Sequence, residues 1–214
     1  MYPIRDLLSR VGGMMFFGFL LYRRARVVPS DFWLVVWWLE VVYFILLILT
    51  YVLRSQVRER AVGFSERWLP FLIPMFLMSL GTEPIVHADL RMWAISLLMV
   101  GDAIQLTGVW TLRRNFSVMV EARSVVSQGI YRYVRHPLYL GGFFSGAGVW
   151  LLRMSVWTTV LFVLFVVGEV YRAVLEERKL EGSFPEYTSY KQCVPMFIPW
   201  HGGFQRHRQA SPKV

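Results

Sequence analysis

The sequence predicts an all-α integral membrane protein with about five to six transmembrane helices, the last two of which form a C-terminal helical hairpin. Hydrophobic residues make up 56% of the 214 positions, and the 16 Phe, 10 Tyr and 9 Trp add more apolar surface than one soluble core of this length buries. Charged residues make up only 17% and avoid the long apolar blocks. Such blocks are typical of segments that cross a bilayer.

The composition also excludes several classes of protein. The net charge of +9 comes from basic residues in short loops between hydrophobic runs, so no nucleic-acid partner is predicted. Cys193 is the only cysteine, which excludes an internal disulfide and a multi-cysteine metal site, and we interpret it as a packing residue. The histidines show no metal-ligand spacing, so no metal is predicted.

The N-terminal half contains four apolar runs. Run 32–53 has 22 residues interrupted only by Glu40 and spans roughly 33 Å as a helix, enough to cross a bilayer. Runs 68–80 and 92–112 are the next candidates. Run 11–22 is short, which fits a short span, a re-entrant piece or a signal-peptide core; because no small-residue cleavage site follows it, we favour a retained anchor.

The C-terminal half begins with a long polar segment, 113–137, and then contains the predicted hairpin. Runs 138–152 and 156–171 are separated by three residues, which is typical of two antiparallel helices. Small residues in the first of them are expected to let it approach a neighbouring helix closely. These are Gly142 and Gly146, with Gly141 and Gly148 beside them.

The loop charges predict the orientation. If the first run spans, 18 of the 23 Lys and Arg residues fall on one side of the membrane. That side holds residues 1–10, 54–67, 113–137 and 172–214. The positive-inside rule therefore places the polar loop and the C-terminus in the cytoplasm. Function is expected where segments 113–137 and 172–200 meet.

Two local patterns mark that region. Pro137, directly after Arg135 and His136, suits the first turn of a helix, whose free N–H groups favour an anionic ligand. Spacings of three and four place Glu169, Arg172 and Glu176 on one helix face, where they form a salt-bridge ladder or a functional cluster. Three polar residues lie deeper in apolar runs and are interpreted mainly as hydrogen-bond partners in the bundle, with a substrate channel as the alternative: Glu40, Asp102 and Gln105.

The motifs of residues 113–200 resemble the isoprenylcysteine carboxyl methyltransferase family and its prokaryotic relatives. They read Gly129-x-Tyr131, then Arg135-His136-Pro137-x-Tyr139-x-Gly141, and later Arg172-x3-Glu176-Glu177-x2-Leu180. The resemblance implies three parts of the chain: variable N-terminal transmembrane helices (1–112), a cofactor-binding region (113–200) that includes the 138–171 hairpin, and a polar tail (201–214). The stretch Phe184 to Tyr187 is one residue shorter than in the family.

The resemblance also implies S-adenosyl-L-methionine as the cofactor and a set of residues that hold it. By motif match these are Glu121, Arg123, Ser124, Val125, Val126, Tyr131, His136, Pro137, Leu138, Tyr139 and Glu176. Arg172 matches the arginine that the family assigns to the substrate. The implied reaction is O-methylation of a carboxylate on a lipophilic, prenylcysteine-like substrate, which reaches the site from the membrane lipid. An ionised carboxylate needs no general base.

Two other enzyme classes and one non-enzymatic role stay open at this point. A phospholipid or lipid-amine N-methyltransferase would need a proton acceptor, with Glu177, Glu169 or His136 as candidates. A sterol-type reductase would carry a related Arg-His-Pro segment and use NADPH. A membrane scaffold that keeps an old cofactor pocket would bind without turnover. The sequence predicts no oligomeric state.

Overall fold

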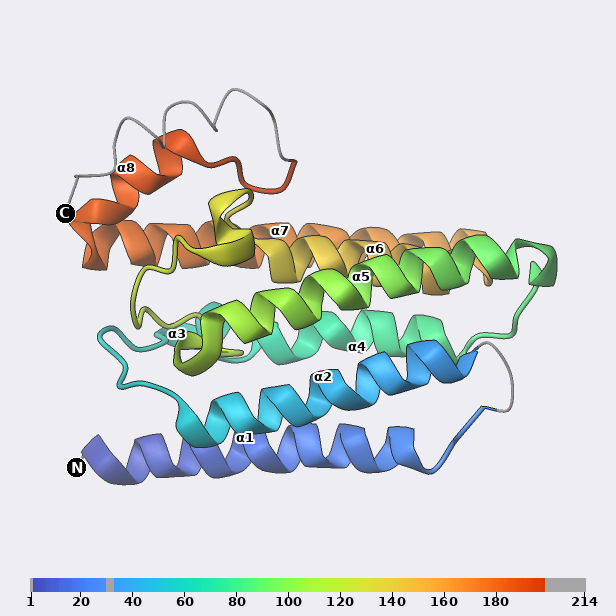
Figure 1. Ribbon diagram of the computed structural model, residues 1–214, viewed down its shortest axis with the longest axis horizontal. Coiled ribbons are helices and arrows are strands. Elements are labelled where there is room, and N and C mark those ends of the chain that lie inside the picture. Colours follow the sequence, from blue (N-terminus) through green and yellow to red (C-terminus); the bar gives the residue numbers. More distant parts are fainter. Residues whose placement is uncertain (1, 30–32, 199–214) are drawn as a thin grey trace.

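The computed structural model describes residues 2–29 and 33–198, so the predicted tail 201–214 lies outside the described residues. Within them the chain is helical, and its one β-type contact is the isolated bridge between Glu59 and Ala122. Six long helices lie side by side (Figure 1). They are α1 (Tyr2–Ala25), α2 (Trp33–Leu53), α4 (Leu69–Thr82), α5 (Arg91–Leu112), α6 (Pro137–Leu151) and α7 (Val156–Ser183). The shorter helices are α3 (Gly63–Arg67) and α8 (Pro185–Cys193), with 3-10 turns η1 (Ala88–Leu90), η2 (Arg113–Asn115) and η3 (Gly129–Arg132).

The apolar composition of these helices identifies an integral membrane protein. Among the described residues, three segments are long and apolar enough to cross a bilayer: Trp33–Leu53, Ala88–Asn115 and Val156–Ser183. The predicted hairpin of α6 and α7 is confirmed, and α7 continues past the apolar run 156–171, as the predicted place of Glu176 on the same helix requires. The first helix is longer than the predicted run 11–22, because the polar residues before that run continue the same helix back to Tyr2.

The six long helices form a ring. Following the contacts, α1 packs on α2, α2 on α5, α5 on α6, α6 on α7 and α7 on α4. The ring closes between α1 and α4, where Phe16 meets Phe71 edge to face at 5.7 Å between ring centroids. Since α4 does not follow α2 in this order, helices that are adjacent in sequence are not always neighbours in space.

The contact between α5 and α6 is the closest in the ring and depends on glycine. A Cβ added at Gly141 would lie 2.6 Å from the carbonyl oxygen of Gly101, and one added at Gly148 would lie 2.8 Å from the carbonyl oxygen of Ala94. Gly142 and Gly146 instead face aromatic rings of α7. The predicted close approach is therefore made by Gly141 and Gly148, the other two glycines of the predicted set.

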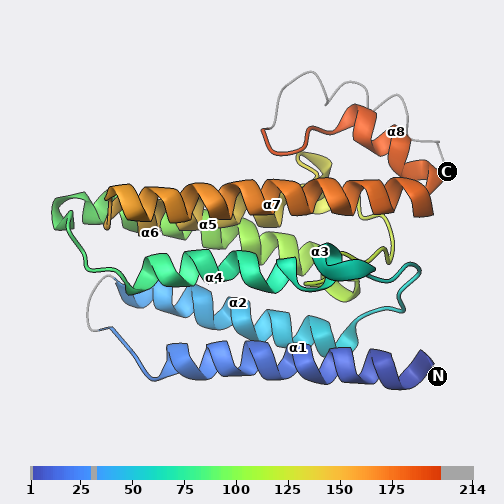
Figure 2. The same ribbon diagram turned by 180° about the vertical axis from the view of Figure 1, so that it is seen from behind.

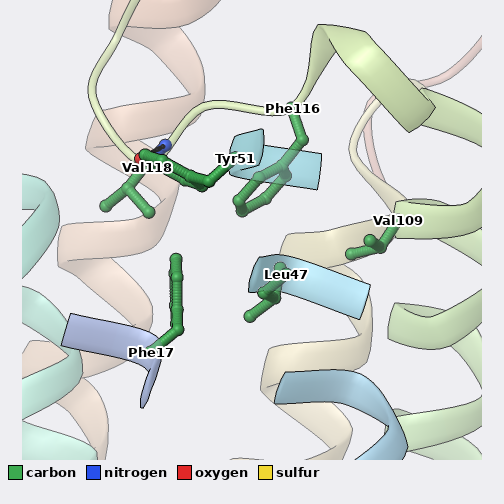
Figure 3. Close-up of a cluster of buried hydrophobic side chains, with 6 residues drawn as sticks. All are labelled: Phe17, Leu47, Tyr51, Val109, Phe116 and Val118. Carbon is green, nitrogen blue, oxygen red and sulfur yellow. Dashed lines mark hydrogen bonds between the residues drawn. The ribbon is translucent and has the colours of Figure 1, made fainter. Parts of the chain in front are cut away.

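The loops gather at the two ends of the ring, as the sequence predicted. Segments 54–67 and 113–136 and helix α8 lie at the end that holds the N-terminus (Figures 1 and 2). A buried cluster fixes the start of the 113–136 segment to three helices, with its side chains pointing toward one another (Figure 3). It consists of Phe17, Leu47, Tyr51, Val109, Phe116 and Val118. The Tyr51 hydroxyl accepts a hydrogen bond from the Val118 amide at 3.1 Å.

Candidate active site

A cavity of about 800 Å³ occupies the centre of the ring. All six long helices contribute to its wall, for example through Phe17, Tyr43, Pro74, Gln105, Tyr139 and Arg172. Segment 115–126 and α8 cover it at the loop end, where Ser124 and Tyr187 line it. The cavity therefore joins the polar segments to the apolar interior of the bundle.

The structure brings the predicted site residues together around this cavity. All of them line it except Pro137, which is buried at the first turn of α6. The lining members are Glu121, Arg123, Ser124, Val125, Val126, Tyr131, His136, Leu138, Tyr139, Arg172 and Glu176. These residues come from positions up to 55 apart in sequence (121 to 176), so only the fold makes them one site.

Arg172, Tyr139 and Glu176 form the polar centre of the wall. The Arg172 guanidinium lies over the Tyr139 ring at 5.1 Å from its centroid, a cation–π contact. The Tyr139 hydroxyl donates to the Glu176 carboxylate at 2.7 Å. Arg172 also pairs with Glu169 at 3.5 Å and donates to the Val118 carbonyl. The predicted three-residue ladder is thus incomplete, because Glu176 bonds Tyr139 instead of Arg172.

One N–H donor of the Arg172 guanidinium has no acceptor among the described residues. This donor is Nε, which is buried. Buried guanidinium donors are normally satisfied, so an acceptor from a ligand in the cavity is the natural partner. The guanidinium is planar and can donate two parallel hydrogen bonds, so it matches the two oxygens of a carboxylate better than a lysine ammonium does.

The start of α6 offers further donors. His136 is the N-cap residue, Pro137 occupies the first turn, and no described side chain caps this end. Helix starts of this kind carry unpaired N–H groups and a partial positive charge. Leu138 and Tyr139, the next two residues, line the cavity. The structure therefore has a helix start without a described side-chain cap at the place where the sequence predicted a helix start.

A buried ion cluster fastens the C-terminal segment over the site. The Glu177 carboxylate accepts from Arg135 Nε at 2.7 Å, lies 3.1 Å from His136 Nε2 and 3.2 Å from Lys191 Nζ. The backbone N–H groups of Arg135 and His136 donate to the carbonyls of Pro195 and Met196 at 2.9 and 3.1 Å. Residues 135–136 and 195–196 therefore lie side by side.

We expect Glu177→Ala to destabilise the protein, because it leaves the buried Arg135 guanidinium without its carboxylate partner. Removing one member of a buried ion cluster costs about 3–5 kcal/mol. The control is Glu181→Ala, since Glu181 pairs with Lys191 at the surface and exposed pairs contribute about 0–1 kcal/mol. Thermal unfolding of the detergent-purified variants measures both. Equal unfolding midpoints for the two variants would contradict a structural role of Glu177.

The N-terminal half builds one wall of the site, which the sequence did not predict. Ala122 pairs through its backbone with Glu59, at 3.0 and 3.1 Å for the two N···O distances. Arg123 donates to the Ser55 carbonyl and pairs with Glu121 at 2.8 Å. The 113–126 segment is thus held by the linker after α2. Backbone pairing of this kind leaves no side-chain pattern from which it could be predicted.

Sequence reasoning also missed polar residues contributed by α1 and α2. Tyr43 and Arg24 line the cavity, and Arg24 forms an ion pair with Glu40. Asp102 accepts a hydrogen bond from Ser145 Oγ at 3.0 Å. Glu40 and Asp102 therefore have partners within the bundle, as predicted, and also face the cavity. No spacing in the N-terminal half marks Arg24 or Tyr43 as lining residues.

Burial sets the protonation of the tyrosines at the loop end. Removal from water raises the pKa of the Tyr131 phenol well above its usual value, and the neighbouring Glu176 raises it further. Burial likewise raises the pKa of Tyr190, whose hydroxyl donates to the Tyr131 carbonyl. Both phenols are therefore protonated at neutral pH, and the Tyr190 hydroxyl is a hydrogen-bond donor. Tyr187 lines the cavity beside them.

A ring of apolar helices around a cavity with a polar centre at one end defines a helical membrane protein with a cavity inside its helix bundle. Comparison with known proteins agrees with that class. The family model described as phospholipid methyltransferase matches residues 90–186.

Curated relatives narrow the class. The protein-S-isoprenylcysteine O-methyltransferase of Mus musculus is 28% identical over 159 residues, which cover 68% of this chain and 53% of the relative. The enzyme of the same name from Saccharomyces cerevisiae is 31% identical over 55% of this chain and 57% of the relative. Methanethiol S-methyltransferase 1 of Bradyrhizobium diazoefficiens is 40% identical over 33% of this chain and 25% of the relative.

Over part of its length the chain is therefore similar to the phospholipid methyltransferase family model and to enzymes named protein-S-isoprenylcysteine O-methyltransferase. It spans about half the length of the first curated relatives that it matches. The family model includes both sequence segments that carry the polar centre of the cavity, around Tyr139 and around Arg172.

Proposed function

We propose that this protein is an integral membrane methyltransferase that uses S-adenosyl-L-methionine to methylate a carboxylate on a lipophilic substrate, most simply a prenylcysteine-like molecule. The observation that carries the proposal is the unpaired Arg172 Nε in a cavity lined by nearly all the motif residues. The similarity to these methyltransferases supports it.

The residues present fit such a cofactor. The uncapped start of α6 at Leu138 and Tyr139 suits the carboxylate of the methionyl part. The aromatic ring of Tyr131 and the carboxylate of Glu176 suit the adenosyl part and the positive sulfonium. When bound, the cofactor supplies an activated methyl group. Glu121 and Arg123, already paired with each other, would shape the wall beside it.

Arg172 would orient the substrate. Its charge and free Nε would hold one carboxylate oxygen in place, while its contact with Tyr139 fixes the guanidinium relative to the cofactor side of the cavity. Because methyl transfer is an in-line displacement, alignment of the two reactants in a dry cavity supplies most of the catalysis. The carboxylate is ionised at neutral pH, so no residue has to remove a proton.

The contacts disfavour the amine-methylating alternative. Each candidate proton acceptor already has a charged partner. Glu177 contacts Arg135, His136 and Lys191, so His136 is engaged as well. Glu169 pairs with Arg172. A general base needs a free lone pair directed at the substrate. Glu177 and His136 use theirs in the ion cluster, which leaves Glu169, with its single contact to Arg172 among the described residues, as the one candidate that lines the cavity with a free oxygen.

The membrane placement follows from the ring and the loop charges. We infer five to six spans, with α4 and α6 crossing as part of the ring although they have only 14 and 15 residues. The loop end, with most of the basic residues, would face the cytoplasm. Cofactor would then arrive from the cytoplasm at segment 115–126, and the apolar part of the substrate would arrive from the bilayer.

Calorimetric titration with S-adenosylhomocysteine, with NADPH in parallel, tests the proposal. We expect micromolar binding of the first and none of the second. Binding of NADPH alone would support the sterol-type reductase instead. S-adenosylhomocysteine binding without methyl transfer to any prenylcysteine, fatty-acid or phospholipid acceptor would support the scaffold.

Glu176→Ala should weaken that binding by about 10–100-fold, because a hydrogen bond to a charged group contributes about 1.5–3 kcal/mol. Glu181→Ala is the matched control, since Glu181 lies on the same helix but is partly exposed and pairs with Lys191. Unchanged affinity of the Glu176 variant would remove this residue from the cofactor site.

A further inference from the structure

A polar cluster lies inside the cavity, away from the loop end. It consists of Asp102 and Gln105 of α5 and Ser145 of α6, and all three residues line the cavity. Ser145 Oγ donates to Asp102 Oδ1 at 3.0 Å and accepts from Gln105 Nε2 at 3.3 Å. The serine hydroxyl therefore both donates and accepts a hydrogen bond, and it orients the Asp102 carboxylate.

Asp102 has an acceptor that the protein does not use. The residue is only 7% exposed, and its Oδ2 is buried with no hydrogen-bond partner among the described residues. Leaving a buried acceptor unpaired costs free energy, and more when the group is charged. The neighbouring acid of the cavity, Glu40, is paired with Arg24. Asp102 therefore has a carboxylate oxygen that can accept a hydrogen bond from a ligand in the cavity.

The position of this oxygen relative to Arg172 constrains the ligand. Ser145 follows Tyr139 by six residues on α6, which is about 9 Å along the helix axis. The Arg172 guanidinium lies over the Tyr139 ring. The Arg172 site and the Asp102–Ser145 site are therefore separated by roughly 9 Å. Gly142, which lies between Tyr139 and Ser145 on α6, and the Phe165 ring beside it give this part of the wall an apolar surface. A ligand that satisfies both sites has an anionic head, an apolar stretch and then a hydrogen-bond donor.

We propose that Asp102, oriented by Ser145, binds a hydroxyl group in the apolar part of the substrate. The methyl acceptor would then be a hydroxylated lipid acid, not a plain hydrocarbon chain. This inference rests on the proposed function for its carboxylate end at Arg172. A hydroxyl fits because an ionised carboxylate oxygen only accepts, and a hydroxyl supplies one donor without bringing a second charge into the cavity.

Calorimetric binding of three matched acids to the detergent-purified full chain tests the site. The probes are hexadecanoic acid, 8-hydroxyhexadecanoic acid and 2-hydroxyhexadecanoic acid. We expect the 8-hydroxy acid to bind about tenfold or more tightly than the other two, from one hydrogen bond to a charged group. Asp102→Asn should reduce this preference and Asp102→Ala should abolish it. The control is Ser96→Ala, because Ser96 lies on α5 with its side chain exposed and bonded to its own helix.

Each outcome decides the proposal. Equal affinities of the three acids, or no binding of any of them, would overturn the hydroxyl site. A preference that survives in Asp102→Ala, in protein whose thermal unfolding shows that it is folded, would remove Asp102 from the site. Methyl-ester formation with added S-adenosyl-L-methionine is measured on the same samples. A hydroxyl preference without methyl ester would refute the proposed reaction while leaving the binding site in place.

Discussion

Replacing Arg172 by lysine is expected to lower kcat/KM by about 10–100-fold, the value of one lost charge-assisted hydrogen bond. Lysine keeps the positive charge and the contact with the Tyr139 ring. It loses the planar fork whose Nε is unpaired in the structure. The loss should therefore fall on the orientation of the carboxylate and not on the binding of cofactor.

The measurement is methyl-ester formation, with S-adenosylhomocysteine affinity determined on the same protein. Arg178→Lys is the control, because Arg178 lies on the same helix with an exposed side chain. Arg172 also donates to the Val118 carbonyl, so Arg172→Ala would remove one of the bonds that hold the 113–126 segment as well. That second variant should lose both turnover and some cofactor affinity. Normal turnover of Arg172→Lys would contradict the proposal that the Arg172 guanidinium orients the substrate carboxylate.

The C-terminal half of the site could be predicted because its signals are local. Pro137 after His136 marks a helix start, and the three-residue gap between runs 138–152 and 156–171 marks a hairpin. The structure has a helix start and a hairpin at these places. The spacing of Arg172 and Glu176 on one helix also follows from sequence alone. The hydrogen-bond partners of these two residues do not follow from the sequence, because Glu176 accepts from Tyr139 of another helix.

The N-terminal half could not be predicted in the same way, because its role depends on contacts between distant segments. The pairing of Glu59 with Ala122 is made by backbone groups, which every residue carries. Lys179 reaches across the fold to the Arg60 carbonyl at 2.7 Å. The ring order, with α4 between α1 and α7, is set by which helix faces fit together. None of these contacts produces a periodicity or a motif.

Because α5 and α6 are in backbone contact, substitutions of two neighbouring glycines of α6 are expected to change the stability of the protein very differently. Gly141→Ala is expected to destabilise the protein by about 3 kcal/mol, at the upper end of overpacking costs. Its new Cβ would lie 2.6 Å from the Gly101 carbonyl oxygen, and also 2.6 Å from Gln105 Cγ. The carbonyl belongs to helix backbone, which cannot rotate away as a side chain can. The two helices would have to separate, and Tyr139 and Leu138 would move with α6.

Gly142→Ala is the matched control one residue along the same helix. Its Cβ would meet only the Phe165 ring at 3.6 Å, an ordinary van der Waals contact. Because alanine is a better helix former than glycine, this variant should be unchanged or more stable by up to about 1 kcal/mol. Thermal unfolding in detergent, followed by tryptophan fluorescence, compares the two. Equal unfolding midpoints would mean that α5 and α6 are not in backbone contact, and the ring that encloses the cavity would then need a different closure.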